Sequence, residues 1–462
     1  MNIIIENLGP IKKATFNLDK RLSVFCGPNN TGKTYLSYVL YAYTRRRVYL
    51  PNERLTDEQV NSFVSNRSLE IPLEDDRIYK LTLQRLKNIK NDLGTIFGLS
   101  DENAKRLFPK FRIKLDQNAE KYREDLVSNN YDFEFYLTRN VLVKVSKKAG
   151  GQSILLKNLS KSMDASDRDE IKYTLLTALY HYFVVSPIFD SHFFPVERTS
   201  MFTYHKDIQG TRNKLVDMLH SQEGINQQQT ISFIMKNSSQ FPLVIGQTLD
   251  AANSMGQTRK NKGYYSKLAD EIERDIMHGK LIVTDEGDLQ FASEGAMDKV
   301  VPLQLSASME KAVSGIVFYL RHISGNGDLV FIDEPEVNCH PNIQVLMSRI
   351  FAKMVNAGLR LVISTHSDYI IRELNNLIML NGAPIDISDD LIRWGYTSDM
   401  RLSSEDVAAY LFNYDVENKK VEMTPLRVTD TGFEVSTIDA IISQQNEISQ
   451  ALYYHLRYGK KE

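Results

Sequence analysis

Residues 27–34, GPNNTGKT, constrain the fold of this chain more than any other stretch, because they fit the pattern GxxxxGK(S/T). The apolar run 22–26 precedes them, and the run 35–40 follows them. This order predicts a strand, a glycine-bounded loop and a helix, which is the structural context of a phosphate-binding P-loop. We therefore predict a nucleotide site at this loop.

The residue types within the loop suit the binding of ATP and Mg²⁺. Gly27 and Gly32 permit backbone angles that other residues avoid, so that successive N–H groups can point inward at a phosphate. The N-terminus of the following helix adds partial positive charge. We expect Lys33 to reach the β- and γ-phosphates and the Thr34 hydroxyl to complete the Mg²⁺ shell. The loop residues expected to line the nucleotide between these positions are Asn29, Asn30 and Thr31.

Composition limits the class of protein. A chain of 462 residues exceeds one ordinary hydrophobic core, so two or three lobes are expected. The formal charge of −2 argues against a chain-wide coat for nucleic acid, although a local basic patch stays open. Two cysteines, Cys26 and Cys339, cannot form a disulfide framework, which favours a cytoplasmic location. We expect neither secretion nor membrane insertion, since a leader and a long apolar run are missing from the sequence.

A second motif lies far along the chain, where the apolar run 329–332 ends in Asp333 and Glu334. A buried strand with this ending would place both carboxylates at the carboxyl edge of a sheet, where ligands bind in α/β folds. We expect Asp333 to hold Mg²⁺ and Glu334 to orient and deprotonate the attacking water. The long separation from the P-loop favours a nucleotide domain that is split by a large insertion.

A further apolar run, 359–365, ends at His366. A histidine at the tip of a strand beside the Asp-Glu strand can hydrogen-bond a γ-phosphate or the attacking water. The alternative is a histidine that is satisfied in the core or at its rim. Because of its position at a strand end, we predict His366 as a catalytic residue together with Glu334 and Lys33.

These motifs together resemble ABC-type ATPases of the SMC, RecF and OLD group. They are the P-loop, the segment DEPE of residues 333–336 with His340 and Pro341, and Thr365 to Ser367, and the resemblance spans about residues 1–375. It implies a head-to-head dimer in which ATP is clamped between the P-loop of one subunit and a serine-containing signature of the other.

The matching signature segment is residues 302–311, PLQLSASMEK, at the start of an apolar helix. It lacks the usual glycine, so both Ser306 and Ser308 stay candidates for the γ-phosphate contact. A serine at the helix N-cap would still present backbone N–H groups to an anion. By similarity, Glu197 and Arg198 lie after the loop that senses nucleotide; the alternative is a surface ion pair.

The predicted fold class is α/β: an ABC-type P-loop ATPase head, with an N-terminal β lobe and a parallel-sheet core, an inserted helical subdomain and a small C-terminal α+β region. Alternating runs predict hairpins over 141–156 and 281–292. The last helix, about 436–458, has an apolar face that we expect to pack on the head or, less favoured, on a partner. The expected segments are 1–50, the first part of the head with the P-loop; 51–138, a helical insertion; 139–206, head strands; 207–278, a helical arm; 279–380, the second part of the head; and 381–462, a C-terminal α/β extension.

Residues 381–462 lack the glutamate and Asp-x-Asp pattern of the Toprim nuclease that often follows in OLD proteins. The chain resembles the stand-alone ATPases of bacterial anti-phage systems such as Septu and PARIS. This implies an oligomeric ATPase, a homodimer or a higher oligomer, that controls a separately encoded nuclease or toxin effector and responds to DNA or a phage protein. The alternatives are an SMC/RecF-like DNA-repair ATPase that binds duplex DNA, and a nucleotide-stabilised scaffold with little hydrolysis.

Overall fold

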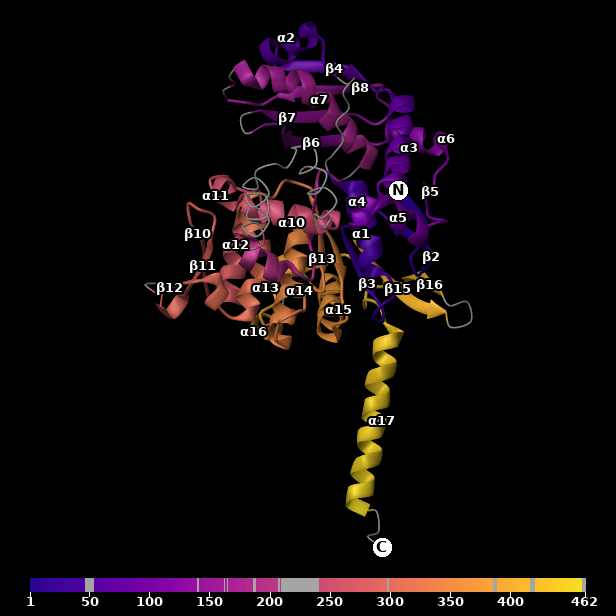
Figure 1. The fold of residues 1–462 in the computed structure, drawn as a ribbon, viewed down its shortest axis with the longest axis vertical. Helices are drawn as coiled ribbons and strands as arrows, with labels where there is room; N and C mark the ends of the chain where they lie inside the picture. Colours follow the sequence, from indigo (N-terminus) through magenta and orange to yellow (C-terminus); the bar gives the residue numbers. More distant parts are fainter. Residues whose placement is uncertain are drawn as a thin grey trace, which may run out of the picture.

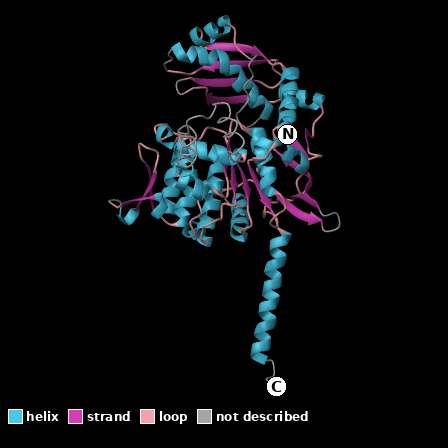
Figure 2. Cartoon of the chain, in the orientation of Figure 1, coloured by secondary structure: helices cyan, strands magenta, loops and turns pink. Residues whose placement is uncertain are grey.

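The chain folds around a nine-stranded sheet, with a smaller sheet in a second lobe above it (Figure 1). Figure 2 shows helices on both sides of the large sheet. The α/β class is therefore confirmed. The computed structural model describes residues 1–45, 54–138, 141–161, 163, 165–185, 188–206, 208, 241–296, 299–384, 389–415 and 420–458.

The nine-stranded sheet combines a parallel half with a mixed half, in which β16 and β2 are parallel and the other pairs are antiparallel. Five neighbouring strands, β15, β3, β14, β13 and β9, run parallel, and β16, β2, β1 and β5 continue the sheet beyond β15. β3, β13 and β14 are almost wholly buried, which explains their near-continuous apolar sequences. The strand order is β5 (Arg112–Leu115), β1 (Asn2–Leu8), β2 (Ile11–Asn17), β16 (Lys420–Leu426), β15 (Val407–Asp415), β3 (Leu22–Cys26), β14 (Arg360–Ser364), β13 (Leu329–Asp333) and β9 (Ser191–Phe194).

Two hydrophobic clusters cover the two faces of this sheet. Successive side chains of a strand point to opposite faces, so Phe25 belongs to the cluster with α1 (Lys33–Thr44), whereas Val24 belongs to the other. The second cluster also contains the buried faces of three long helices, so both sides of the strands that carry the motifs are held rigidly. These helices are α13 (Ser308–His322), α14 (Pro341–Asn356) and α15 (Asp368–Gly382).

The expected helical insertion over 51–138 contains strands as well as helices, which corrects that expectation. Strands β4 and β6 join β7 and β8 in the order β4-β8-β7-β6, and β5 joins the main sheet. The predicted hairpin of β7 and β8 is confirmed, but it belongs to this second lobe instead of the head. The elements are α2 (Asp57–Ser65), β4 (Ser68–Pro72), α3 (Asp75–Asn91), α4 (Leu93–Phe97), α5 (Asp101–Leu107), α6 (Ala119–Ser128), β6 (Tyr131–Tyr136), β7 (Leu142–Lys147), β8 (Ser153–Asn158) and α7 (Ala165–Val185).

The expected arm over 207–278 lies partly outside the described residues. The described part, 241–278, packs into the head, because α12 lies against α13 and its apolar residues join the second cluster. The hairpin predicted over 281–292 is confirmed as β10 and β11, with β12 as a third strand. The elements are α10 (Leu243–Asn253), α11 (Met255–Thr258), α12 (Ser266–Ile272), a π-helical turn (Glu273–Met277), β10 (Gly279–Val283), β11 (Leu289–Ser293) and β12 (Val300–Pro302).

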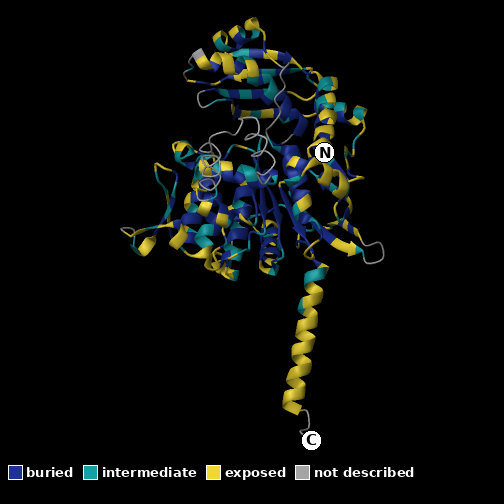
Figure 3. Cartoon of the chain, in the orientation of Figure 1, coloured by how far each residue is buried: buried dark blue, intermediate teal, exposed yellow. Residues whose placement is uncertain are grey.

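The C-terminal segment is divided between the head sheet and a projecting helix. β15 and β16 lie between β3 and β2, so they complete the head sheet and do not form the separate extension expected for 381–462. A short helix, α16 (Asp389–Arg393), precedes them. The last helix, α17 (Ser436–Tyr458), projects from the head (Figures 1 and 3). The expected packing on the head holds only at its start, where Ile438 lies half-buried against the second cluster, and is wrong for the rest of the helix, which is mostly exposed. Among the described helices, none has the length and apolar character needed to cross a bilayer.

Candidate nucleotide-binding site

Three neighbouring parallel strands end at the same edge of the head sheet. β14 lies between β3 and β13, and its register pairs Ser364 with Phe25 on one side and with Asp333 on the other. Parallel strands expose their carboxyl ends together, so the loops after these strands meet. The structure thus brings together the P-loop, the two carboxylates and His366, as the sequence predicts.

The P-loop follows β3 directly and leads into α1, so the predicted strand, loop and helix are confirmed. Gly27 and Gly32 have φ values of +131° and +89°, in the region that favours glycine. A Cβ atom at Gly27 would lie 2.3 Å from the carbonyl oxygen of Phe412 on β15, so the close packing of this strand also requires glycine. The hydroxyl of Thr31 donates to Pro28 O at 2.8 Å and braces the loop, whose Asn29 is exposed.

Lys33 is buried at the start of α1 and points back at its own loop. Its ammonium donates hydrogen bonds to Gly27 O at 2.9 Å and to Pro28 O at 2.8 Å. Burial lowers the pKa of this ammonium, and the negative charge of Asp333 acts in the opposite direction. A cation at the mouth of a P-loop and beside a helix N-terminus suits the phosphates of a nucleotide.

Thr34 and Asp333 meet although 299 residues separate them along the chain. The Thr34 hydroxyl donates to Asp333 Oδ2 at 2.9 Å, and the Ser364 hydroxyl donates to Asp333 Oδ1. Hydroxyl and carboxylate oxygens are the ligands that Mg²⁺ prefers, so these residues fit the Mg²⁺ ion expected from the sequence. Ser364 is a residue that the sequence analysis missed; its position at the end of a core strand was the available signal.

Glu334 and His366 face one another across the ends of β13 and β14. His366 Nε2 lies 3.8 Å from the Glu334 carboxylate. Burial and the charge of Asp333 raise the pKa of Glu334, whereas burial and the charge of Lys33 lower the pKa of His366. Glu334 also has a φ of +45°, a strained conformation for a residue with a side chain. A carboxylate with a raised pKa is suited to accept a proton from water.

Glu336 lies behind this pair and was not predicted as a site residue. Its Oε1 accepts the His366 backbone N–H at 2.6 Å and the Thr365 hydroxyl at 2.9 Å. Its Oε2 is buried without a hydrogen-bond partner among the described residues, and burial raises the pKa of this carboxyl group. Glu336 therefore fixes the loop that carries His366. Its place in the segment DEPE, two residues after Glu334, was the sequence signal.

The Arg198 side chain donates hydrogen bonds to the backbone of the turn after β13. The residue is 1% exposed, which excludes the surface ion pair considered from the sequence. It donates to the carbonyl oxygens of Asp333 at 2.7 Å and Glu334 at 3.1 Å, and to those of Pro195 and Ala312, each at 3.1 Å. Burial lowers the pKa of this guanidinium. Arg198 thus supports the site through backbone atoms.

The signature segment is separate from these residues within one chain. Ser306 follows a 3₁₀ turn (Leu303–Leu305), and its hydroxyl donates to Leu303 O at 2.8 Å. Ser308 is the first residue of α13 and is exposed, but the N-cap is Ala307, which corrects the expected serine cap. Within the described chain, neither serine is hydrogen-bonded to the P-loop or to the carboxylates. A role for them in a second subunit's site stays a prediction.

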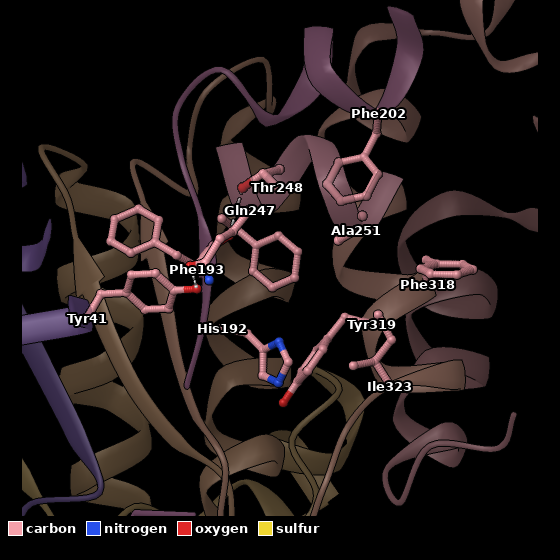
Figure 4. Close-up of a pocket in the computed structure, with 12 residues that line it drawn as sticks. Tyr41, His192, Phe193, Phe202, Gln247, Thr248, Ala251, Phe318, Tyr319 and Ile323 are labelled. Atoms are coloured by element: carbon pink, nitrogen blue, oxygen red, sulfur yellow. Dashed lines mark hydrogen bonds between the residues drawn. The ribbon is translucent and has the colours of Figure 1, made fainter. Parts of the chain in front are cut away.

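A cavity of about 60 Å³ lies elsewhere in the head, between β9, α10 and α13 (Figure 4). Beside it, Asp328 accepts the Tyr319 hydroxyl at 2.9 Å and lies 3.5 Å from His192 Nε2. Burial would lower the pKa of His192, but Asp328 outweighs it, so the pKa is raised. Asp328 precedes β13 and His192 is near the start of β9, so this polar cluster lies at the opposite strand ends from the P-loop.

The head domains of SMC proteins are among the solved structures to which this chain is similar. The SMC head domain from Thermotoga maritima shares 10% identity with a TM-score of 0.31, covering 92% of this chain and 98% of that one. An Smc head bound to the C-terminal winged-helix domain of ScpA shares 10% identity with a TM-score of 0.33 over the same shares. A Pyrococcus furiosus Smc head with an extended coiled coil, bound to the C-terminal domain of ScpA, has the same identity and TM-score, covering 97% and 98%.

Comparisons with curated proteins and with protein families give different results. No curated protein matches the chain. The AAA_15 family, described as AAA ATPase domain, matches residues 1–371, which include the P-loop, Asp333, Glu334, Glu336 and His366. Since this match covers most of the sequence and the structure unites these residues at one sheet edge, the chain belongs to the AAA ATPase domain family AAA_15.

Proposed function

We propose that the protein binds Mg²⁺-ATP at this sheet edge and hydrolyses it to ADP and phosphate. The observation that carries this proposal is the 2.9 Å hydrogen bond between Thr34 and Asp333, at the base of a glycine-bounded loop. It supports a Mg²⁺ position beside the loop, because hydroxyl and carboxylate oxygens suit Mg²⁺ and the N–H groups of the loop suit phosphates. The family supports the same substrate.

Each residue at the site has a role that follows from its position. Lys33 and the N–H groups of the loop would hold the phosphates, and Thr34 and Asp333 would hold Mg²⁺. Bound Mg²⁺ supplies positive charge that neutralises the phosphate oxygens. Glu334 would accept a proton from the water that attacks the γ-phosphorus, while His366, held neutral by its lowered pKa, would orient that water or a γ-phosphate oxygen.

We further propose that the site is completed by a second copy through Ser306 or Ser308. The exposure of the signature segment supports this arrangement, since Leu305 beside Ser306 is 76% exposed. The segment is therefore accessible to a second subunit. The missing glycine of the segment favours the alternative of a nucleotide-stabilised scaffold with little hydrolysis, in which the dimer forms but turnover is slow.

The resemblance of the motif set to stand-alone anti-phage ATPases supports a biological role. We propose that the protein is the ATPase subunit of a bacterial defence complex and controls a separately encoded nuclease or toxin. ATP binding would favour one state of the assembly and hydrolysis another, because only ATP supplies the γ-phosphate contact. Phage plaque counts on cells that carry the neighbouring genes, with wild type or Glu334→Gln, test this role: equal counts would contradict it.

Phosphate release from Mg²⁺-ATP tests the enzymatic proposal directly. We expect wild-type turnover to fall by roughly 100-fold or more in Glu334→Gln, because removal of a general base costs about that much. Glu120→Gln in α6, an exposed residue of the second lobe, is the matched control and should behave as wild type. Equal, minimal phosphate release by wild type and Glu334→Gln would support the scaffold instead. Strong stimulation by duplex DNA would support an SMC/RecF-like repair ATPase.

A further inference from the structure

The last helix exposes several large apolar side chains. α17 projects from the head, and along most of its length its residues are exposed (Figures 1 and 3). Leu456 is 85% exposed, Leu452 59%, Ile441 58% and Ile448 43%. Helices in proteins gain most of their stability from packing of an apolar face, so a projecting helix with such residues calls for a partner.

The large aliphatic residues of α17 share one face. Most of them recur at spacings of three and four residues, and Gln445 fills the gap of six between Ile442 and Ile448, which places them along a single stripe of a helix with 3.6 residues per turn. The α17 stripe consists of Ile438, Ile441, Ile442, Ile448, Leu452 and Leu456. Gln445 and Ser449 are the polar residues within it. The charged residues Asp439, Glu447 and Arg457 lie on other faces of the helix, so the stripe itself is uncharged.

We propose that the α17 stripe pairs with the α17 stripe of a second copy of this chain, with the two helices antiparallel. An alignment that sets Ile442 level with Leu452 also sets Leu456 level with Ile438, which is half-buried beside the head. The same alignment puts Gln445 level with Ser449, so that the polar residues meet in the middle and apolar residues meet on both sides. A single polar layer of this kind is known to fix the register of paired helices.

The charges of the helix favour the same arrangement. Asp439 lies in the first turn of α17, whereas His455 and Arg457 lie in the last. An antiparallel pair places the acidic end of each helix beside the basic end of the other, and it also opposes the two helix dipoles. A parallel pair would instead bring the two acidic ends together and the two basic ends together. The stripe has no charge that would recognise an acidic or basic partner, so a second copy fits it best.

The pairing is independent of the proposed ATP site. Because α17 projects from the head, an antiparallel pair would carry the two heads at opposite ends of the paired helices (Figure 1). The P-loop and signature segment of each head belong to other elements and stay available to another subunit. The α17 contact should therefore form without nucleotide and persist in Lys33→Ala.

Sedimentation velocity of the full chain without nucleotide tests the pairing. We expect wild type to form dimers as the concentration rises, and Ile448→Asp or Leu452→Asp to stay monomeric at the same concentrations. Gln450→Asp is the matched control, because it puts the same charge on the opposite face of the helix and should dimerise as wild type. A monomeric wild type, or dimers that persist in both stripe variants, would overturn the proposal. Retained ATP binding shows that a monomeric variant is folded.

Cysteine cross-linking tests the orientation. Coexpressed chains that carry Ile442→Cys and Leu452→Cys should give a disulfide-linked heterodimer after oxidation, because the antiparallel alignment puts these positions level. Chains with Ile442→Cys alone should remain unlinked. Both native cysteines are buried and free, so they leave the result unaffected. Linkage of Ile442→Cys chains to each other would show a parallel pair and overturn the antiparallel arrangement.

Discussion

The backbone N–H of His366 donates a 2.6 Å hydrogen bond to the carboxylate of Glu336. The same oxygen accepts the hydroxyl of Thr365, so one buried carboxyl group ties the end of β14 to the turn after β13. Glu334 lies in that turn, 3.8 Å from the His366 ring. The separation of the two proposed catalytic side chains therefore depends on a residue that would itself touch neither water nor phosphate.

Glu336→Ala should lower kcat by on the order of 100-fold, because displacement of a positioned group by about 1 Å has an effect of that size. ATP affinity should stay close to that of wild type, since the P-loop is unchanged. Phosphate release and nucleotide titration measure the two quantities. Glu336→Gln keeps an acceptor oxygen and should retain more activity than Glu336→Ala. Equal losses in the two variants would show that the carboxylate itself takes part in the chemistry.

Removal of the Thr34 hydroxyl should weaken the response to Mg²⁺. We expect Thr34→Ala to need roughly 10-fold or more Mg²⁺ for half-maximal turnover, because it lacks one of the two proposed oxygen ligands. Thr34→Ser keeps the hydroxyl and should follow the wild-type Mg²⁺ titration closely. If Thr34→Ala and wild type give the same Mg²⁺ dependence, the assignment of the metal position is incorrect.

The pH dependence of turnover should reflect Glu334. A general base acts when deprotonated, so kcat should rise with pH through a pKa that lies above the ordinary value of 4.5. The pKa of His366 is lowered from 6.5, so this ring is neutral at pH 7. We expect it to cause no change in turnover above pH 6.5. Turnover of wild type and His366→Gln from about pH 5 to about pH 8 should show the same rising limb. If the rise in turnover with pH disappears in His366→Gln, the titrating group is the histidine and not Glu334.

Arg198→Ala should destabilise the head strongly. The guanidinium donates to four carbonyl groups, and each buried acceptor left without a donor costs about 1–3 kcal/mol. Relaxation and water entry reduce the total, so we expect the free energy of unfolding to fall by about 3–5 kcal/mol. Urea denaturation measures it, with Arg106→Ala on exposed α5 as the control. A loss below about 1 kcal/mol would contradict the proposed support of the turn.

The parts of the site that consist of consecutive residues were predictable from the sequence. The P-loop and the Asp333-Glu334 strand end are short segments whose residue types and flanking apolar runs carry the information, and the structure unites them. The roles of Arg198 and Glu336 were harder to predict from the sequence. Both side chains act through hydrogen bonds to segments that are distant along the chain. Such contacts leave no pattern of spacing in the chain.

For the strands too, pairing of neighbouring segments was predictable and pairing of distant segments was not. β10 and β11 form a hairpin of neighbouring segments, and alternation was enough to predict it. β15 and β16 pair with β3 and β2 from the other end of the sequence, which alternation cannot reveal. β4 is only five residues long and lies between two helices. The helical periodicity of the surrounding sequence therefore masked the alternation that buries Leu69 and Ile71. The apolar stripe of α17 was visible, but its exposure was not.

The place of β3 in the sheet has a consequence for biosynthesis. This strand is made early, yet both of its neighbours, β14 and β15, come from the last quarter of the chain. A nascent chain on the ribosome therefore exposes the β3 edge until residues 360–364 and 407–415 emerge. Synthesis that stops earlier would leave an unpaired apolar strand for chaperones and proteases, so quality control would remove incomplete copies before they could join an assembly.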